Sequence, residues 1–130
     1  MIEIDLGHPP LPPLSINKPL HWAARRRELE PWKQWMWVLA KEHKLSQRVR
    51  GRPCFVQFAL PFNDDRRRDP HNYTGTVVKA CVDALVSAGV WPDDTAKYVT
   101  VIDPELFKGK NVKLRLELRD REEQDEVRGA

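Results

Sequence analysis

Residues 112–118 alternate strictly between apolar and charged side chains, in the order VKLRLEL. Successive side chains of a β-strand point to opposite faces of a sheet, so this pattern predicts a strand with one buried and one solvated face. Residues 2–6, in the order IEIDL, alternate in the same way and predict a second such strand. Both strands are therefore expected to belong to a sheet that another layer covers on its apolar face.

Between these strands the apolar spacing twice becomes helical. A first helix is predicted with Pro31 in its first turn, where the missing amide hydrogen costs nothing, and with its end at about Lys44 or Leu45. Trp32 begins the apolar face of this helix. Trp37 lies off that face and is the better candidate for a dimer or ligand surface.

The remaining elements are assigned from β-branched and aromatic runs and from the positions of glycine and proline. The order β-α-β-α-β-β indicates an α+β fold in which two helices pack on a small mixed sheet. Length favours one domain over 1–130, with a charged and partly frayed tail over 119–130. The other predicted segments are strands over 54–60 and 98–102, a helix over 76–88 that Gly89 ends, and connectors over 8–13, 48–53 and 61–68.

The charge of the chain is unevenly distributed. Residues 117–130 hold six acids against three arginines, which leaves 19 basic and 13 acidic residues in the first 116. The body of the protein is thus more basic than the overall charge of +3 suggests. A basic surplus favours a polyanionic partner such as nucleic acid.

The two cysteines and the lack of long apolar runs indicate the compartment. Cys54 and Cys81 lie in apolar contexts without metal-binding spacing, so we expect buried, reduced thiols. No apolar run approaches the ~20 residues of a membrane-spanning helix, and no signal peptide precedes the first strand. We therefore expect a soluble, cytoplasmic protein with no membrane partner.

A cluster of basic, acidic and amide side chains surrounds the predicted second helix. Positive charge suited to phosphates adjoins carboxylates suited to a hard cation. Metal-assisted hydrolysis of a phosphodiester requires this combination. The residues are Arg66, Arg67, Arg68, Asp69, His71, Asn72, Lys79, Asp93 and Asp94.

Members of this cluster also have structural interpretations. Asp69 can cap a turn or a helix, and Asp93 and Asp94 can be turn acids. Lys79 can pair with Asp83 four residues later, or it can face the charge that develops on a scissile phosphate. The residues alone leave open whether the Asp93–Asp94 pair lies near Asp69.

Two motifs of this cluster resemble a known family. RRRDPHN over 66–72, followed by KACVDALVSAGVWPDD over 79–94, resembles the RusA-type Holliday-junction resolvases. The segment PPLSIN, which contains Asn17, is similar to the proline-rich start of that family. The resemblance, strongest over 66–99, implies a RusA-like fold. It also implies a homodimeric, Mg²⁺-dependent endonuclease that makes paired, symmetric nicks in four-way DNA junctions during recombination and repair, often encoded by phages or prophages.

The resemblance also implies roles for single residues. Asp69 matches the first essential acid of the family, and Asp94 matches the acid of its Asp-Asp pair, with Asp93 beside it. Lys79 matches the catalytic lysine, and His71 stands where the family has a second acid. The predicted catalytic residues are Asp69, His71, Lys79 and Asp94, and the predicted metal ligands are Asp69, His71, Asp93 and Asp94. The predicted DNA-binding residues are Asn17, Lys18, Arg66, Arg67, Arg68, Asn72 and Lys97.

This chain departs from the family pattern in two places. An imidazole at His71 suits Mn²⁺ better than Mg²⁺, although either ion could bind. Between Asn72 and Lys79 the chain also has about one extra helical turn. If that segment is helical, Lys79 lies roughly 6 Å further along a similar face; alternatively, Gly75 marks a loop and Thr76 caps the helix.

Two other functions fit the same residues. A catalytically degenerate protein would bind four-way junctions without nicking them, because His71 has replaced an acid. A broader nuclease would cut flaps, forks and other branched DNA with little preference for four-way junctions.

Overall fold

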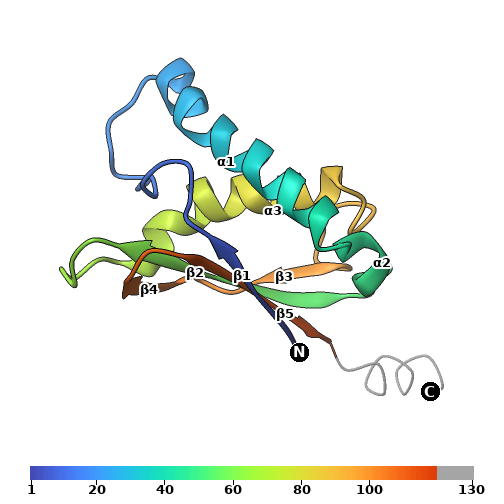
Figure 1. Ribbon diagram of the computed structural model, residues 1–130. Helices are drawn as coiled ribbons and strands as arrows, with labels where there is room; N and C mark the ends of the chain where they lie inside the picture. Colours follow the sequence, from blue (N-terminus) through green and yellow to red (C-terminus); the bar gives the residue numbers. More distant parts are fainter. Residues whose placement is uncertain (120–130) are drawn as a thin grey trace.

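The computed structural model describes residues 1–119 as a mixed five-stranded sheet with its long helices on one face (Figure 1). The strand order is β1-β5-β2-β3, and β4 also pairs with β2. This arrangement confirms the predicted α+β fold. The elements are β1 (Ile2–Gly7), α1 (Trp22–Glu42), α2 (Leu45–Val49), β2 (Cys54–Phe62), the 3₁₀-helix η1 (Pro70–Tyr73), the π-helix η2 (Thr74–Val78), α3 (Lys79–Ser87), β3 (Val99–Val101), β4 (Glu105–Lys108) and β5 (Val112–Leu118).

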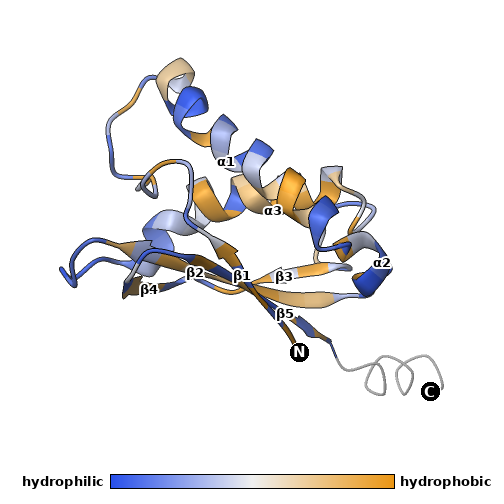
Figure 2. Ribbon diagram, viewed as in Figure 1, coloured by the Kyte–Doolittle hydropathy of each residue, from blue (hydrophilic) through white to orange (hydrophobic). Residues whose placement is uncertain are grey.

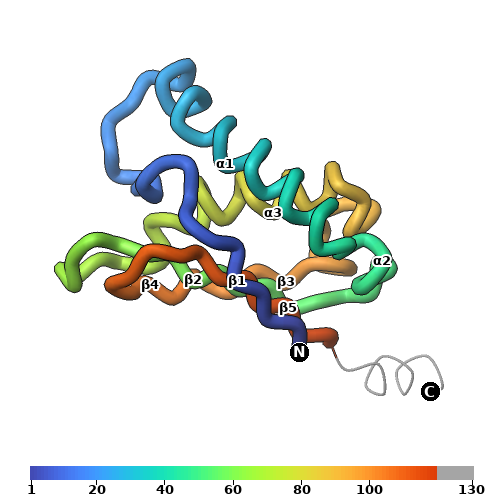
Figure 3. Tube along the Cα trace, in the orientation of Figure 1, coloured from blue at the N-terminus to red at the C-terminus, as the bar shows by residue number. Residues whose placement is uncertain are grey.

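The two alternating segments lie side by side in the sheet. Strand β5 runs antiparallel to both β1 and β2, so that Leu114 lies opposite Ile4 on one side and Phe58 on the other. All three side chains are buried. The trace then leaves β1 and rises over the sheet to the start of α1 (Figure 3). The prediction of two strands with one buried face each is therefore confirmed.

Strands β3 and β4 both pair in parallel with β2, one after the other. Cys54 lies opposite Val99 in β3, and Leu60 lies opposite Leu106 in β4. Parallel neighbours need a crossover connection, which η1, η2 and α3 provide between β2 and β3. The short break between β3 and β4 contains Asp103, which lies beside the middle of β2.

The first helix is longer than predicted. It begins at Trp22, where the His21 side chain accepts a hydrogen bond from the Ala23 amide at 3.3 Å, so the prediction that Pro31 lies in the first turn is wrong. An interior proline removes one helical hydrogen bond. The buried stripe that begins at Trp32 and Met36 offsets this cost by packing against the core. The helix ends at Glu42, close to the predicted position.

Three other boundaries differ from the prediction. The connector expected over 48–53 contains the end of α2, a helix held by the fully buried side chains of Leu45 and Val49. Strand β2 extends past residue 60 because β4 pairs with its last residues, and β4 was not predicted. The first residues of the helix expected over 76–88 belong to the π-helix η2, which follows η1, and α3 itself begins at Lys79. The described part of the chain thus contains three α-helices where two were predicted.

The core lies between the helices and the sheet. Apolar residues gather on α3 and on the strands, whereas much of α1 and the loop after β2 is hydrophilic (Figure 2). Cys54 and Cys81 are buried and free, as predicted. Burial raises the pKa of both thiols, which keeps them protonated at neutral pH. Within residues 1–119, no helix combines the length and the apolar character needed to cross a bilayer.

The predicted frayed tail lies almost entirely outside the described residues. Its first residue, Arg119, is held in place: its amide donates to the Pro53 carbonyl at 3.0 Å, and its guanidinium donates to the Ala96 carbonyl at 2.8 Å. These bonds dock the residue after β5 against the body of the protein, and the partly frayed tail over 119–130 stays a prediction.

Candidate functional site

The loop after β2 leads directly into the site. Asp69 is the N-cap of η1, and its Oδ1 accepts a hydrogen bond from the His71 amide at 3.0 Å. The predicted capping role of Asp69 is confirmed. A cap of this kind uses one carboxylate oxygen and leaves the other exposed to solvent or to a ligand.

A π-helix separates the residues of η1 from Lys79. The amide of Lys79 donates to the Thr74 carbonyl, which closes the wide turn of η2. Thr76 is buried, and its hydroxyl donates to the carbonyls of Leu14 and Tyr73. The alternative in which Gly75 marks a loop and Thr76 caps the helix is therefore wrong. Single π-helical turns frequently occur at functional sites.

The proline-rich start of the chain packs against this part of the site. The Ile16 amide donates to the Asn72 carbonyl at 2.8 Å. Asn17 and Lys18 follow on the surface, where Lys18 Nζ lies 3.8 Å from Glu28 Oε1. Two segments that resembled the same family, and that lie more than 50 residues apart in the chain, are thus in direct contact.

Lys79 lies between two carboxylates. Its Nζ is 2.8 Å from Asp83 Oδ1 and 2.6 Å from Asp94 Oδ2. The hydrogen bonds to Asp83 and Asp94 raise the pKa of Lys79, and the bond from Lys79 lowers the pKa of Asp94. The predicted pairing with Asp83 is confirmed, and the same lysine also reaches the loop that carries the Asp-Asp pair.

His71 has a carboxylate partner that sequence reasoning missed. Its Nδ1 lies 3.1 Å from Asp103 Oδ1, and the Thr74 hydroxyl donates to the same oxygen at 2.7 Å. The hydrogen bonds from Thr74 and His71 lower the pKa of Asp103. The one available signal was an acid directly after the strand predicted over 98–102.

These contacts join four of the predicted residues, together with Thr74 and Asp103, into one network. Asp69 binds the amide of His71, the His71 ring meets Asp103, and Asp103 accepts from Thr74. The Thr74 carbonyl then accepts from the amide of Lys79, whose side chain reaches the Asp94 carboxylate. The network runs through η2, and within the described residues no hydrogen bond or ion pair joins Asp69 directly to Asp94. The members are Asp69, His71, Asp103, Thr74, Lys79 and Asp94.

Asp93, the first residue of the Asp-Asp pair, has a different environment. Its Oδ1 accepts hydrogen bonds from the Thr95 amide at 2.9 Å and the Thr95 hydroxyl at 2.6 Å. These bonds lower the pKa of Asp93. The structural interpretation of Asp93 as a turn acid is confirmed, and in this position it orients the loop that carries Asp94.

The donor types at this site suit Mg²⁺ or Mn²⁺. Within residues 1–119, however, no three His, Cys, Asp or Glu side chains form a group that could hold a metal ion. Mg²⁺ is usually bound by one or two carboxylates together with water and substrate phosphates. An ion at this site would therefore have to complete its shell with water and substrate phosphates. The assignment of Asp69, His71, Asp93 and Asp94 as its ligands stays a prediction.

The three arginines differ from one another. Arg68 is held by an ion pair to Asp64 at 2.9 Å and by the Phe62 ring, whose centroid is 4.0 Å from its guanidinium carbon. Arg66 and Arg67 are exposed, and among the described residues neither forms an ion pair. Arg68 thus anchors the loop, and its two neighbours are the ones available to a phosphate. Lys97 is exposed near the Tyr98 ring, in the loop after Asp94.

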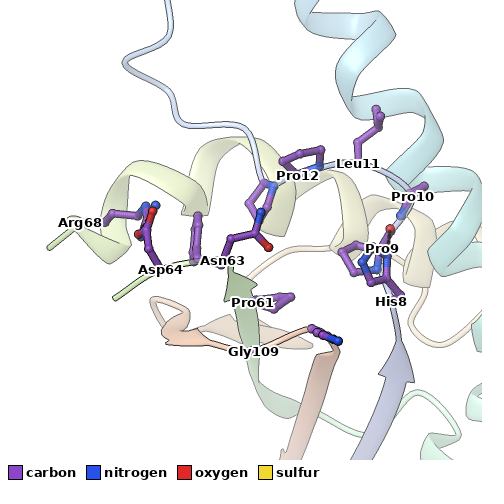
Figure 4. A pocket seen from close by; sticks show the side chains of 13 residues that line it. His8, Pro9, Pro10, Leu11, Pro12, Pro61, Asn63, Asp64, Arg68 and Gly109 are labelled. Carbon is purple, nitrogen blue, oxygen red and sulfur yellow. Dashed lines mark hydrogen bonds and ion pairs between the residues drawn. The ribbon is translucent and has the colours of Figure 1, made fainter. Parts of the chain in front are cut away.

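A pocket of about 310 Å³ lies next to the arginine-bearing loop after β2 (Figure 4). The proline-rich connector forms one wall, and Pro61, Asn63 and the Asp64–Arg68 pair border the other side. The connector expected over 8–13 therefore lies against the arginine-bearing loop, a proximity that the sequence did not indicate.

Comparison with known proteins does not assign a family. A scan against models of protein families and a search of curated proteins both found no match. The function therefore has to be inferred from the residues and their geometry.

Replacing Lys79 with Met should destabilise the protein at neutral pH, by an amount that shrinks as the solution becomes acidic. Lys79 lowers the pKa of Asp94, so their ion pair contributes stability above the usual pKa of a carboxyl group. That contribution is lost as the pH falls through the lowered pKa. Both side chains are about half exposed, so the effect is modest.

Urea unfolding of wild type and Lys79→Met at neutral and at strongly acidic pH measures this difference. Lys110→Met serves as the control, since Lys110 forms no ion pair within the described residues. A stability difference that stays the same at both pH values would contradict the role of the ion pair.

Proposed function

We propose that this protein is a metal-dependent endonuclease that resolves four-way DNA junctions by paired, symmetric nicks. The observation that carries the proposal is the network that links Asp69 and His71 on η1 to Lys79 on α3 and to Asp94 in the next loop. Phosphodiester hydrolysis needs carboxylates for a divalent ion and a cation for the phosphate charge. This network contains both.

Each residue of the proposed site has a task. Asp69, His71 and Asp94 would hold one or two divalent ions, which would supply an activated water at neutral pH. Asp94 can exchange Lys79 for a cation, which leaves the lysine ammonium available to stabilise charge on a phosphate oxygen. Asp93 keeps the loop of Asp94 in position through its bonds to the Thr95 residue.

A homodimer suits the proposed substrate. A four-way junction has approximate two-fold symmetry, and a two-fold dimer can place one site on each of two opposed strands. Trp37, which is 41% exposed beside a pocket between α1 and α3, is the proposed dimer contact. The proposed setting is the cytoplasm of a bacterium or a phage-infected cell.

The test uses purified protein with end-labelled four-way junctions and matched linear duplexes, in Mg²⁺ and then in Mn²⁺. Symmetric nicks in the junction alone are the expected result. Tight binding without nicks in either ion would favour the degenerate junction-binding protein. Equal cleavage of flaps, forks and junctions would favour the broader nuclease, and failure to bind any branched DNA would end the proposal.

Removing Arg66 and Arg67 should weaken junction binding and its salt dependence. Each arginine that contacts a phosphate releases counterions on binding, so the slope of log affinity against log salt should fall by about 1 per arginine. A salt titration of junction binding by Arg66→Gln/Arg67→Gln measures this. Arg48→Gln/Arg50→Gln is the matched control, because it also removes two exposed arginines and because α2 lies at the far end of the sheet from the loop after β2 (Figure 1). Equal slopes for the double variant and wild type would contradict the predicted phosphate contacts.

A further inference from the structure

The pairing of His71 with Asp103 is a second, separate feature of the site. The two side chains come from η1 and from the break between β3 and β4, and they meet at 3.1 Å. Thr74 donates to the same carboxylate oxygen at 2.7 Å. The carboxylate is thus held by two partners on the crossover, although the aspartate itself lies between two strands of the sheet.

The backbone around Asp103 is held as well. The Gln57 side chain donates to the Asp103 carbonyl at 3.1 Å, and the Ile102 amide donates to the Val56 carbonyl at 2.9 Å. Gln57 and Val56 both lie in β2, the strand that pairs with β3 and β4. The acid is therefore presented from the edge of the sheet at a defined position, and no Lys or Arg in the described residues forms an ion pair with it.

This geometry determines which nitrogen of His71 carries the proton. An ionised carboxylate can only accept hydrogen bonds, so Nδ1 must be the donor to Asp103. In a neutral ring, Nε2 then presents its lone pair. Histidines that bind metal ions almost always donate their other ring N–H to a carboxylate, a carbonyl or water, which fixes the ring and makes the ligating nitrogen more basic.

We propose that Asp103 is a positioning residue, which holds His71 so that Nε2 binds a divalent cation, with Mn²⁺ preferred over Mg²⁺. Thr74 completes the arrangement by orienting the carboxylate. The preference follows from the imidazole, a poorer ligand for Mg²⁺ than for transition metals. This inference rests on the proposed function for its biological meaning, but cation binding can be measured without DNA.

The test measures Mn²⁺ binding to the full chain by electron paramagnetic resonance, with the nitrogen coupling of the bound ion as a second readout. Asp103→Ala should weaken Mn²⁺ binding by about 10–100-fold and reduce the imidazole coupling. Asp103→Asn keeps a hydrogen-bond acceptor of the same shape and should therefore lose less Mn²⁺ affinity than Asp103→Ala. Glu105→Gln is the charge-matched control, since it removes an exposed acid two residues away that pairs with Arg115, and it should leave Mn²⁺ binding unchanged.

A double-mutant cycle separates positioning from direct coordination. If Asp103 acts through His71, Asp103→Ala should add no further loss in a His71→Ala background. A further loss there would overturn the positioning role, as would full Mn²⁺ affinity and nitrogen coupling in Asp103→Ala. Cleavage assays run alongside distinguish the two proposals. If the wild-type protein does not cleave junctions but the Mn²⁺ results are as expected, only the nuclease function is refuted. If the wild-type protein cleaves junctions and Asp103→Ala changes neither Mn²⁺ affinity nor nitrogen coupling, only this inference is refuted.

Discussion

Replacing Asp69 with Asn is expected to lower the rate of junction cleavage by about 10²-fold or more, with little change in junction affinity. Asn caps a helix as well as Asp does, so the bond to the His71 amide and the start of η1 should survive. The variant therefore removes the negative charge that a cation needs and preserves the local fold.

Single-turnover cleavage and gel-shift binding, each in Mg²⁺ and Mn²⁺, measure the two effects. Asp65→Asn is the matched control, because it removes an exposed acid from the same loop, and it should cut at the wild-type rate. Cleavage by Asp69→Asn at a rate close to that of wild type would contradict the assignment of Asp69 as a metal ligand.

Replacing Trp32 with Ala is expected to lower the free energy of unfolding by about 3–5 kcal/mol. The Trp32 side chain is fully buried in the core and lies edge to face with Trp35, with 5.5 Å between ring centroids. Truncation removes this contact and leaves a large cavity. A loss of this size is a substantial part of the stability of an ordinary domain.

Trp37→Ala tests the same chemical change on the same helix. Trp37 is 41% exposed, so its truncation should cost clearly less than that of Trp32. Urea unfolding, followed by circular dichroism at low protein concentration, gives both values. Equal losses in the two variants would show that the apolar face of α1 has been placed incorrectly.

The strands and the buried face of α1 could be predicted because their signals are local. The alternation over 112–118 reports directly on which side chains face the core, and Val112, Leu114 and Leu116 are buried. The start of α1 was missed because Pro31 is a local signal that burial of the neighbouring stripe overrides. Strand β4 was missed because four residues carry little periodicity and its pairing with β2 is non-local.

The same division holds for the candidate site. The cap formed by Asp69 and the pairing of Lys79 with Asp83 span two and four residues, and both followed from spacing. The contact of Lys79 with Asp94 depends on how the loop after α3 folds back. The partnership of His71 with Asp103 spans 32 residues and requires β3 to pair with β2, which spacing does not reveal.

By itself, then, the sequence determined the class of fold, the apolar faces, the local caps and the types of chemical group available. These properties depend on side-chain periodicity and on contacts between residues close in the chain. Only the tertiary structure decided which groups meet: the proline-rich segment with η1, Lys79 with Asp94, and His71 with Asp103. Such contacts arise from the pairing of distant strands and the path of the crossover between them, and these depend on the packing of the whole core.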